Sequence, residues 1–212
     1  MKKPLIIAID GPSASGKGTL AKKIANHFNL TYLNTGALYR LVAFRVLEQK
    51  VEIKDFEKEI PNLTKNISEN ELENEELFSE KTGGVASIIA KNPKLRQALF
   101  DFQKDFVANS KTNNGCVLDG RDTTTVICPD ANFKFFVQAD VEIRAKRRYE
   151  QLIKKGDKVS FDEILEQLKK RDENDFNRLE APLKIAEDAV VVDNGKLSIE
   201  EGFQKVLEII NC

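Results

Sequence analysis

Residues 5–19, Leu5-Ile-Ile-Ala-Ile-Asp-Gly-Pro-Ser-Ala-Ser-Gly-Lys-Gly-Thr19, decide the fold. The apolar run at 5–9 predicts a central parallel strand that is covered on both faces. Residues 11–17 then fit the pattern G-x-x-x-x-G-K. In such a loop glycines let the backbone approach phosphates, and successive N–H groups at a helix N-terminus bind the anion. We therefore predict a phosphate-binding loop (P-loop), in which Lys17 reaches the β- and γ-phosphate oxygens.

The rest of the chain predicts strands that alternate with helices. Further strands are expected at 116–118, 133–137 and 189–192, and helices near 36–46, 161–168 and 199–210, the last two after capping boxes that begin at Ser160 and Ser198. A long helical region over 85–107 should break near Asn92-Pro93. This alternation predicts a doubly wound parallel α/β sheet, with its ligand at the carboxyl ends of the strands.

Residues 55–77 interrupt this alternation. The segment is polar, rich in Asn and Glu, and has only scattered apolar residues. It predicts an excursion from the core, either a small subdomain or a mobile cap.

The composition is that of an ordinary globular protein, with 212 residues, 41% apolar and 32% charged. Lys+Arg (33) and Asp+Glu (34) nearly cancel to a net charge of -1, which argues against a nucleic-acid partner. The odd set of cysteines, Cys116, Cys128 and Cys212, predicts reduced thiols. The apolar run at 5–9 is too short for a signal peptide, and no stretch is long enough to cross a bilayer. We expect a cytoplasmic monomer without a membrane partner.

A P-loop alone is compatible with a GTPase, an ATPase motor or a kinase. A switch GTPase would carry Asn-Lys-x-Asp after a late strand, whereas this chain has Val191-Val-Asp-Asn-Gly195. Gly18 stands where a hydroxyl residue commonly follows the lysine, and Thr19 comes next. This Gly-Lys-Gly-Thr order is similar to that of nucleoside monophosphate (NMP) kinases.

Further motifs sharpen this likeness. They are Asn34-Thr-Gly-Ala-Leu-Tyr-Arg40, Asp119-Gly-Arg-Asp122, Cys128-Pro-Asp-Ala131, Arg144-Ala-Lys-Arg-Arg148, and Arg171-Asp-x-x-Asp-x-x-Arg178 followed by Ala181-Pro-Leu183. In this order they closely resemble bacterial cytidylate kinase, from Ile7 to about Glu201. The resemblance implies a five-stranded P-loop kinase core (1–54, 112–155 and 179–212), an NMP-binding insertion at about 55–111 and a helical lid at about 156–178. It also implies ATP-dependent phosphorylation of CMP, and of dCMP, by in-line transfer with Mg²⁺.

The resemblance assigns site residues one by one. The ATP phosphates would be held by the loop residues Gly11, Pro12, Ser13, Ala14, Ser15, Gly16, Lys17, Gly18 and Thr19. Thr35 and Tyr39 would line the acceptor pocket. Arg40, Arg121 and Arg178 would bind the acceptor phosphate, Ser87, Arg96 and Asp122 the cytosine, and Arg171 and Asp175 the ribose. Lys17, Arg121, Arg171 and Arg178 would be catalytic, and no residue is assigned as a direct metal ligand.

These residue types suit the chemistry. The reaction brings two polyanions together, so arginines must neutralise charge, and their planar fork grips two phosphate oxygens. Cytosine offers an amine donor beside acceptors, to which an Asp carboxylate and an Arg are complementary; uracil would place a carbonyl against the carboxylate. One departure bears on this pocket: Thr123-Thr124-Thr125 stands where the family commonly has an apolar residue and Gly-Thr, and could alter the loop that presents Asp122.

Several alternatives stay open at this point. Arg144–Arg148 is either an exposed helix face or part of the ATP site, and Asp119 either holds magnesium through water or shapes a turn. His27 reads as a surface helix residue, and Cys128 as a small buried one. Rival functions are a kinase for UMP, AMP or a metabolite such as shikimate, and a nucleotide sensor without turnover.

Overall fold

The computed structural model describes residues 3–52 and 54–211. Its five strands form one sheet in the order β2-β3-β1-β4-β5, and β1 pairs in parallel with β3 and β4, as β4 does with β5. The strands are β1 (Leu5–Asp10), β2 (Thr31–Asn34), β3 (Gly115–Gly120), β4 (Phe133–Gln138) and β5 (Val190–Asp193). The predicted fold class and the four predicted strand positions are confirmed. The position of β2 was not predicted.

Helices connect the strands. They are α1 (Lys17–Phe28), α2 (Thr35–Glu48), α3 (Phe56–Leu63), α4 (Glu69–Leu72), η1 (Glu75–Phe78), α5 (Glu80–Ile89), α6 (Pro93–Ser110), η2 (Thr123–Ile127), α7 (Val141–Lys155), α8 (Phe161–Asn177) and α9 (Ile199–Ile210). The break at Asn92-Pro93 is confirmed: Pro93 opens α6, and Asn92 Oδ1 accepts the backbone N–H groups of Lys94 and Leu95 at 2.9 and 3.1 Å. Both predicted capping boxes, at Ser160 and Ser198, are present.

Two compact units make up the chain, Met1–Leu33 with Ser110–Cys212, and Asn34–Asn109. The second unit contains α2 as well as the polar segment 55–77, which folds into α3, α4 and η1. Arg45 of α2 holds this segment, since its guanidinium donates to Leu63 O at 2.8 Å, Lys65 O at 2.9 Å and Glu71 Oε1 at 2.6 Å. The excursion is therefore ordered by an arginine outside it.

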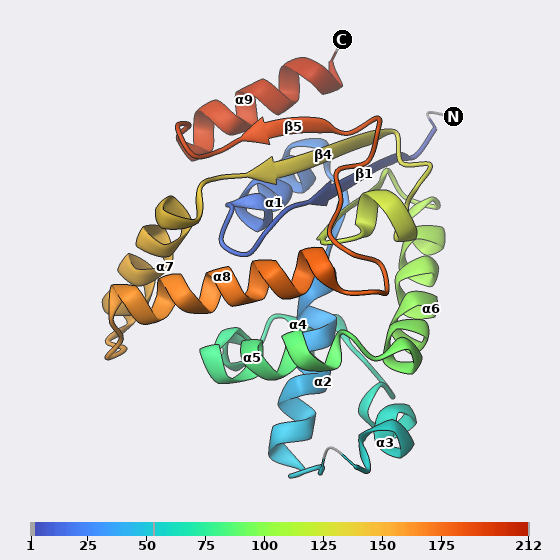
Figure 1. Cartoon of the computed structure of the whole chain (residues 1–212). Helices are drawn as coiled ribbons and strands as arrows, with labels where there is room; N and C mark the ends of the chain where they lie inside the picture. Colours follow the sequence, from blue (N-terminus) through green and yellow to red (C-terminus); the bar gives the residue numbers. More distant parts are fainter. Residues whose placement is uncertain (1–2, 53, 212) are drawn as a thin grey trace. The chain divides into compact units, whose positions relative to one another are not determined.

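The core of the first unit lies on both faces of the sheet. Ile7 and Ile9 of β1 face a cluster with α1 and α9, while Ile6 and Ala8 are buried on the opposite face. Helices α7 and α8 form a smaller cluster through Ala145, Leu152, Ile164 and Leu168. Figure 1 shows β1, β4 and β5 ending on the left of the view, where the loop into α1 and the start of α7 lie. This is the edge at which a ligand was expected.

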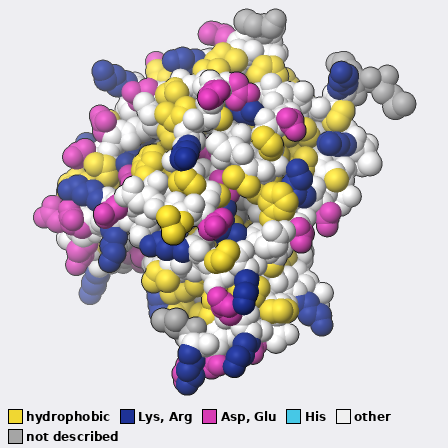
Figure 2. Space-filling view, turned by 45° about the vertical axis from the view of Figure 1, so that its right-hand side comes forward, with side chains coloured by type: hydrophobic (Ala, Val, Ile, Leu, Met, Phe, Trp, Pro, Cys, Tyr) yellow, Lys and Arg dark blue, Asp and Glu magenta, His cyan; other side chains and the backbone are white. Residues whose placement is uncertain are grey.

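Charged side chains of both signs are interspersed on the face drawn in Figure 2. None of the helices in the described ranges is long and apolar enough to span a bilayer. Cys116 and Cys128 are free, buried thiols, and Cys212 lies outside the described residues. His27 is an exposed residue of α1 whose ring meets Phe28 and Phe203 edge-on.

Candidate active site

The P-loop joins β1 to α1 and packs tightly against β4 and against Asn194, which follows β5. A Cβ atom at Gly11 would lie 2.0 Å from Val137 O, and one at Gly16, where φ is +89°, would lie 2.4 Å from Asn194 Nδ2. Only glycine fits these two positions. Ser15 Oγ lies against Gly11, is buried, and has no hydrogen-bond partner within residues 3–52 and 54–211. Because a buried hydroxyl rarely lacks a partner, this orphaned group fits a loop that accepts an anion.

Lys17 lies inside this loop at the start of α1. Its Nζ donates to Pro12 O at 3.0 Å, and the side chain is almost fully buried. Burial, and then the nearby charge of Arg121, lower the pKa of Lys17 to about 7, although Asp119, Asp175 and Asp10 act in the opposite direction. The site thus holds a lysine whose positive charge is disfavoured by burial and which a nearby anion would stabilise.

Arg121 follows β3 and connects three segments of the first unit. Its Nε donates to Asp175 Oδ2 on α8 at 2.6 Å, its Nη2 to Ser13 Oγ of the P-loop at 2.9 Å, and its Nη1 to Gly120 O at 3.1 Å. Burial of Asp175 opposes its ionisation, but the charge and hydrogen bond of Arg121, together with the charges of Arg178 and Arg171, hold the pKa of that carboxyl below its usual value. Predicted donor and acceptor residues therefore meet here.

Arg178 and Asp122 form a second buried pair beside the first. Arg178 Nη2 lies 4.0 Å from Asp122 Oδ1, and both side chains are less than a tenth exposed. Arg178 Nε donates to Ala181 O at 2.7 Å, so the Ala181-Pro-Leu183 motif positions this guanidinium. Arg171 on α8 is close enough for its charge to contribute to the lowered pKa of Asp175.

Two residues of the Thr123-Thr124-Thr125 run anchor their loop to β1. Asp10, fully buried at the end of β1, accepts four hydrogen bonds: from Thr123 N (2.9 Å) and Oγ1 (2.8 Å) and from Thr124 N (2.8 Å) and Oγ1 (2.6 Å). Burial raises the pKa of Asp10, while these four bonds act to lower it. The backbone forms the π-helical turn η2 directly after Asp122. The departure thus places two hydroxyl anchors, Thr123 and Thr124, where the family commonly has an apolar residue and a glycine, in the loop that carries Asp122.

Asp119 at the end of β3 faces the P-loop. Tyr32 donates its hydroxyl to Asp119 Oδ1 at 2.6 Å, and a Cβ at Gly18 would lie 3.6 Å from Asp119 Oδ2 and 3.7 Å from the Tyr32 hydroxyl. The space that a residue after Lys17 would fill is therefore bordered by a carboxylate and a phenol. Tyr32 was not predicted as a site residue, because nothing in its local sequence marks it.

In the second unit the predicted acceptor residues have these surroundings. Arg40 donates to Leu77 O at 2.7 Å and to Ser79 O at 3.2 Å, and a Cβ at Gly83 would meet its Nη2 at 2.8 Å. Arg96 lies 5.7 Å over the ring of Tyr39 and donates to Ala90 O at 3.3 Å. Thr35 is buried at the start of α2, and Ser87 Oγ is buried without a partner in the described part of the chain.

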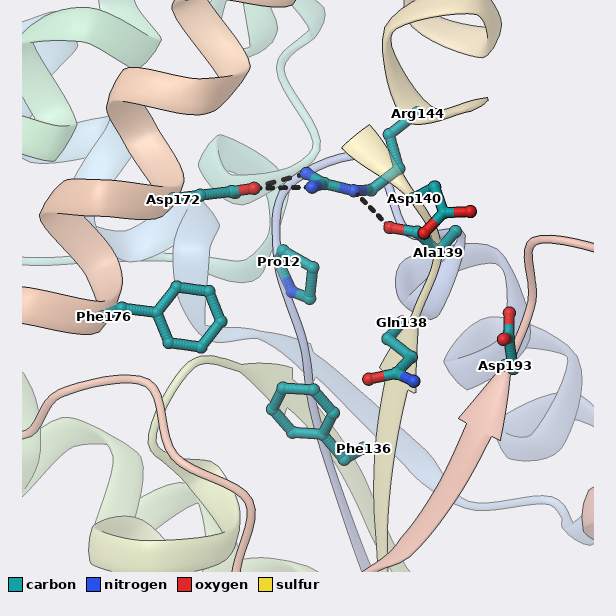
Figure 3. Close-up of a pocket in the computed structure, with 9 residues that line it drawn as sticks. All are labelled: Pro12, Phe136, Gln138, Ala139, Asp140, Arg144, Asp172, Phe176 and Asp193. Carbon is teal, nitrogen blue, oxygen red and sulfur yellow. Dashed lines mark hydrogen bonds and ion pairs between the residues drawn. The ribbon is translucent and has the colours of Figure 1, made fainter. Parts of the chain in front are cut away.

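Arg144 is not part of an exposed helix face. It is 4% exposed and donates to Ala139 O (2.8 Å), Ser13 O (3.0 Å) and both carboxylate oxygens of Asp172. It borders a pocket of about 230 Å³, shown in Figure 3, in which Pro12 of the P-loop lies between the Arg144–Asp172 pair and the rings of Phe136 and Phe176. Gln138, Ala139, Asp140 and Asp193 complete the lining. The exposed-face alternative is therefore wrong for Arg144.

No group of three or more His, Cys, Asp or Glu side chains within 3–52 and 54–211 could hold a metal ion alone. A cation at this site would need oxygen ligands from a nucleotide or from water. The carboxylate of Asp119, beside Lys17, could accept a hydrogen bond from such a water.

A parallel sheet with a P-loop at its carboxyl edge and arginines around it defines a P-loop kinase. The fold is similar to that of shikimate kinase from Bacteroides thetaiotaomicron, with a TM-score of 0.51, 10% identity, and coverage of 98% of this chain and 99% of that chain.

Sequence comparison defines the family. The cytidylate kinase family model matches residues 7–212. Cytidylate kinase of Bartonella tribocorum is 48% identical over 95% of this chain and 92% of that chain, and the Bartonella henselae enzyme is 46% identical over 99% and 95%. The chain belongs to the cytidylate kinase family, which confirms the resemblance found in its motifs.

Proposed function

We propose that this enzyme transfers the γ-phosphoryl group of ATP, bound with Mg²⁺, to CMP and to dCMP by direct in-line displacement. Family membership supports CMP as the acceptor. The observation that carries the mechanism is Arg121, which donates to the P-loop through Ser13 and to α8 through Asp175. A single guanidinium beside the donor loop neutralises charge where two polyanions must meet.

The donor would bind along the P-loop. The orphaned Ser15 hydroxyl, the N-terminus of α1 and Lys17 supply its phosphate contacts. The donor nucleoside would bind in the pocket beside Pro12, which the Phe136 and Phe176 rings line. When bound, Mg²⁺ would neutralise charge on the phosphate oxygens, with Asp119 as its partner through water. Bound phosphates would raise the pKa of Lys17 again and favour its charged form, which would stabilise the transferring group.

The acceptor phosphate would be bound by Arg121 and Arg178, with Arg40 as a third candidate from the second unit. Arg178 is held by Ala181 O, so its guanidinium is oriented before the acceptor arrives. Asp175 and Arg171 are proposed for the ribose. In the structure Asp175 is bound to Arg121, so a ribose hydroxyl would share this carboxylate with the arginine.

Cytosine would be selected by Asp122, with Arg96 and Ser87 as further candidates for the base. Asp122 can accept from the exocyclic amine of cytosine, whereas the carbonyl at the same position of uracil would repel it. Ser87 supports this assignment because its buried hydroxyl has no partner within the described ranges.

We further propose that residues 156–178 act as a lid, that 55–111 form the NMP-binding insertion, and that the enzyme works as a cytoplasmic monomer. The lid contains α8, which carries Asp172 and Asp175 of the two ion pairs described above. Hydrogen exchange with and without a bisubstrate analogue tests this: the proposal predicts slower exchange over 156–178 in the complex, and equal exchange would contradict it.

A coupled ADP-release assay with CMP, dCMP, UMP and AMP tests the function. The proposal predicts rapid ADP release with CMP and dCMP, and much slower release with UMP and AMP. A preference for UMP or AMP would identify a related kinase with another acceptor. Turnover with none of the four would instead favour the metabolite kinase or the sensor alternative.

A further inference from the structure

Asn194 links the P-loop to the segment that follows β5. It follows β5, is 5% exposed, and its backbone N–H donates to Gln138 O at 2.7 Å. Its side-chain Nδ2 donates to Ser15 O of the P-loop at 3.0 Å, in a buried hydrogen bond. Its backbone carbonyl accepts from Arg147 Nη2 of α7 at 2.7 Å. No local sequence pattern singled out this residue as part of the site.

The hydrogen bond to Ser15 fixes the direction of the Asn194 amide. A carbonyl oxygen can only accept, so the nitrogen must face Ser15, and Oδ1 must turn the other way, toward α9. There it meets Gly202, where an added Cβ would lie 2.9 Å from Oδ1. On the P-loop side, a Cβ at Gly16 would lie 2.4 Å from Nδ2. The amide is thus held between two glycines.

Glycine at position 202 is otherwise unfavourable for the stability of α9. It lies in the first turns of α9, and its N–H donates to Ser198 O at 3.0 Å, so its backbone is helical and needs no glycine. Alanine would favour the helix more. The close approach of Asn194 Oδ1 is the physical reason for a residue without a side chain at this position.

The Asn194 bond also orients a backbone donor of the P-loop. In a trans peptide the C=O of Ser15 and the N–H of Gly16 point in opposite directions. Because Asn194 holds that carbonyl, the Gly16 N–H is directed away from Asn194 at the N-terminus of α1, where a phosphate would accept it. Without this bond the peptide could rotate and withdraw its donor.

We propose that Asn194 is a positioning residue for the phosphate donor, and that Gly202 provides the room it requires. This inference rests on the proposed function, because it takes the P-loop to bind the phosphates of ATP. It assigns to α9 an influence on donor affinity without any contact to the donor.

A double-mutant cycle tests the proposal. We expect Asn194→Ala and Gly202→Ala each to raise the KM for ATP, and the Kd for ADP measured by calorimetry, by about five- to tenfold, the range of one lost hydrogen bond. The KM for CMP should change less than about twofold. In the Asn194→Ala background Gly202→Ala should have no further effect on donor binding, since Oδ1 is gone.

Gly84→Ala is the matched control, because Gly84 is also helical and an added Cβ there would meet nothing within 4 Å; it should leave donor binding unchanged. Equal rises in the KM values for ATP and CMP, or fully additive effects of the two substitutions, would overturn the proposal. If Asn194→Ala does not fold, Gly202→Ala alone tests the proposal: its KM for ATP should rise while its KM for CMP stays nearly unchanged. ADP binding is measured without an acceptor. A parent protein that does not phosphorylate CMP would therefore overturn the proposed function, but the Kd values for ADP of parent and variants could still be compared.

Discussion

Arg121 Nε and Asp175 Oδ2 lie 2.6 Å apart, although 54 residues separate them in the chain. Both side chains are mostly buried, at 18% and 15% exposed. The pair joins the loop after β3 to α8, and Arg121 also reaches Ser13 of the P-loop. The residues proposed for donor, acceptor and lid are therefore coupled through one guanidinium, which has consequences for both stability and catalysis.

Asp175→Asn should destabilise the protein by about 3 kcal/mol at pH 7, because it leaves a buried guanidinium without its countercharge. The pKa of Asp175 is lowered in the folded state, so its contribution is present above its ordinary value of 3.8 and is lost as the pH falls below it. Urea unfolding at pH 7 and near pH 3 should show the gap between parent and variant shrinking. A gap that stays constant would contradict this. Glu57→Gln, which breaks the exposed pair with Lys94, is the control and should have little effect.

Lys17 should take up a proton when nucleotide binds. Its pKa in the free protein is about 7, so at pH 8 it is largely neutral, and bound phosphates should raise the pKa again. Affinity for ADP should consequently fall as the pH rises above 7. Calorimetry at pH 8 in buffers of different ionisation enthalpy should report uptake of close to one proton, and Lys17→Met should abolish it. Identical heats in all buffers would refute the assignment.

The fold could largely be predicted from the sequence because its signals are local. The apolar runs of β1, β3, β4 and β5, the P-loop glycines and two capping boxes each lie within a few residues. Strand β2 was missed since it has four residues, of which only Leu33 is buried. Its neighbours in the sheet, not its own pattern, make it a strand.

The site was predictable only in part, since its remaining contacts join residues far apart in the chain. Thr124 reaches Asp10 across 114 residues, and Asn194 reaches Ser15 across 179. Nothing near Tyr32 or Asn194 in the sequence marks them. The role of Arg144 stayed open for the same reason, because Asp172 lies on another helix.

Thr124→Val should loosen the loop that carries Asp122. It removes a 2.6 Å hydrogen bond to a buried carboxylate, which costs about 1.5–3 kcal/mol. We expect a lower free energy of unfolding and a higher KM for CMP, with the KM for ATP nearly unchanged. Thr125→Val, at a half-exposed position of the same turn, is the matched control. Equal losses in the two variants would show that the Asp10 bonds are not what holds this loop.

The central claim is that this P-loop kinase selects cytosine through Asp122, and the ratio of kcat/KM for CMP over UMP tests it most directly. Asp122→Ala removes a charge-assisted hydrogen bond to the cytosine amine and, with it, the repulsion against uracil. The ratio should favour CMP strongly in the parent and fall by about tenfold or more in Asp122→Ala. Arg121→Ala should slow both acceptors together and keep the ratio, because every monophosphate presents the same group and Arg121 pairs with Asp175, not with Asp122. A parent without preference for CMP, or an Asp122→Ala variant that slows CMP and UMP equally, would contradict the claim.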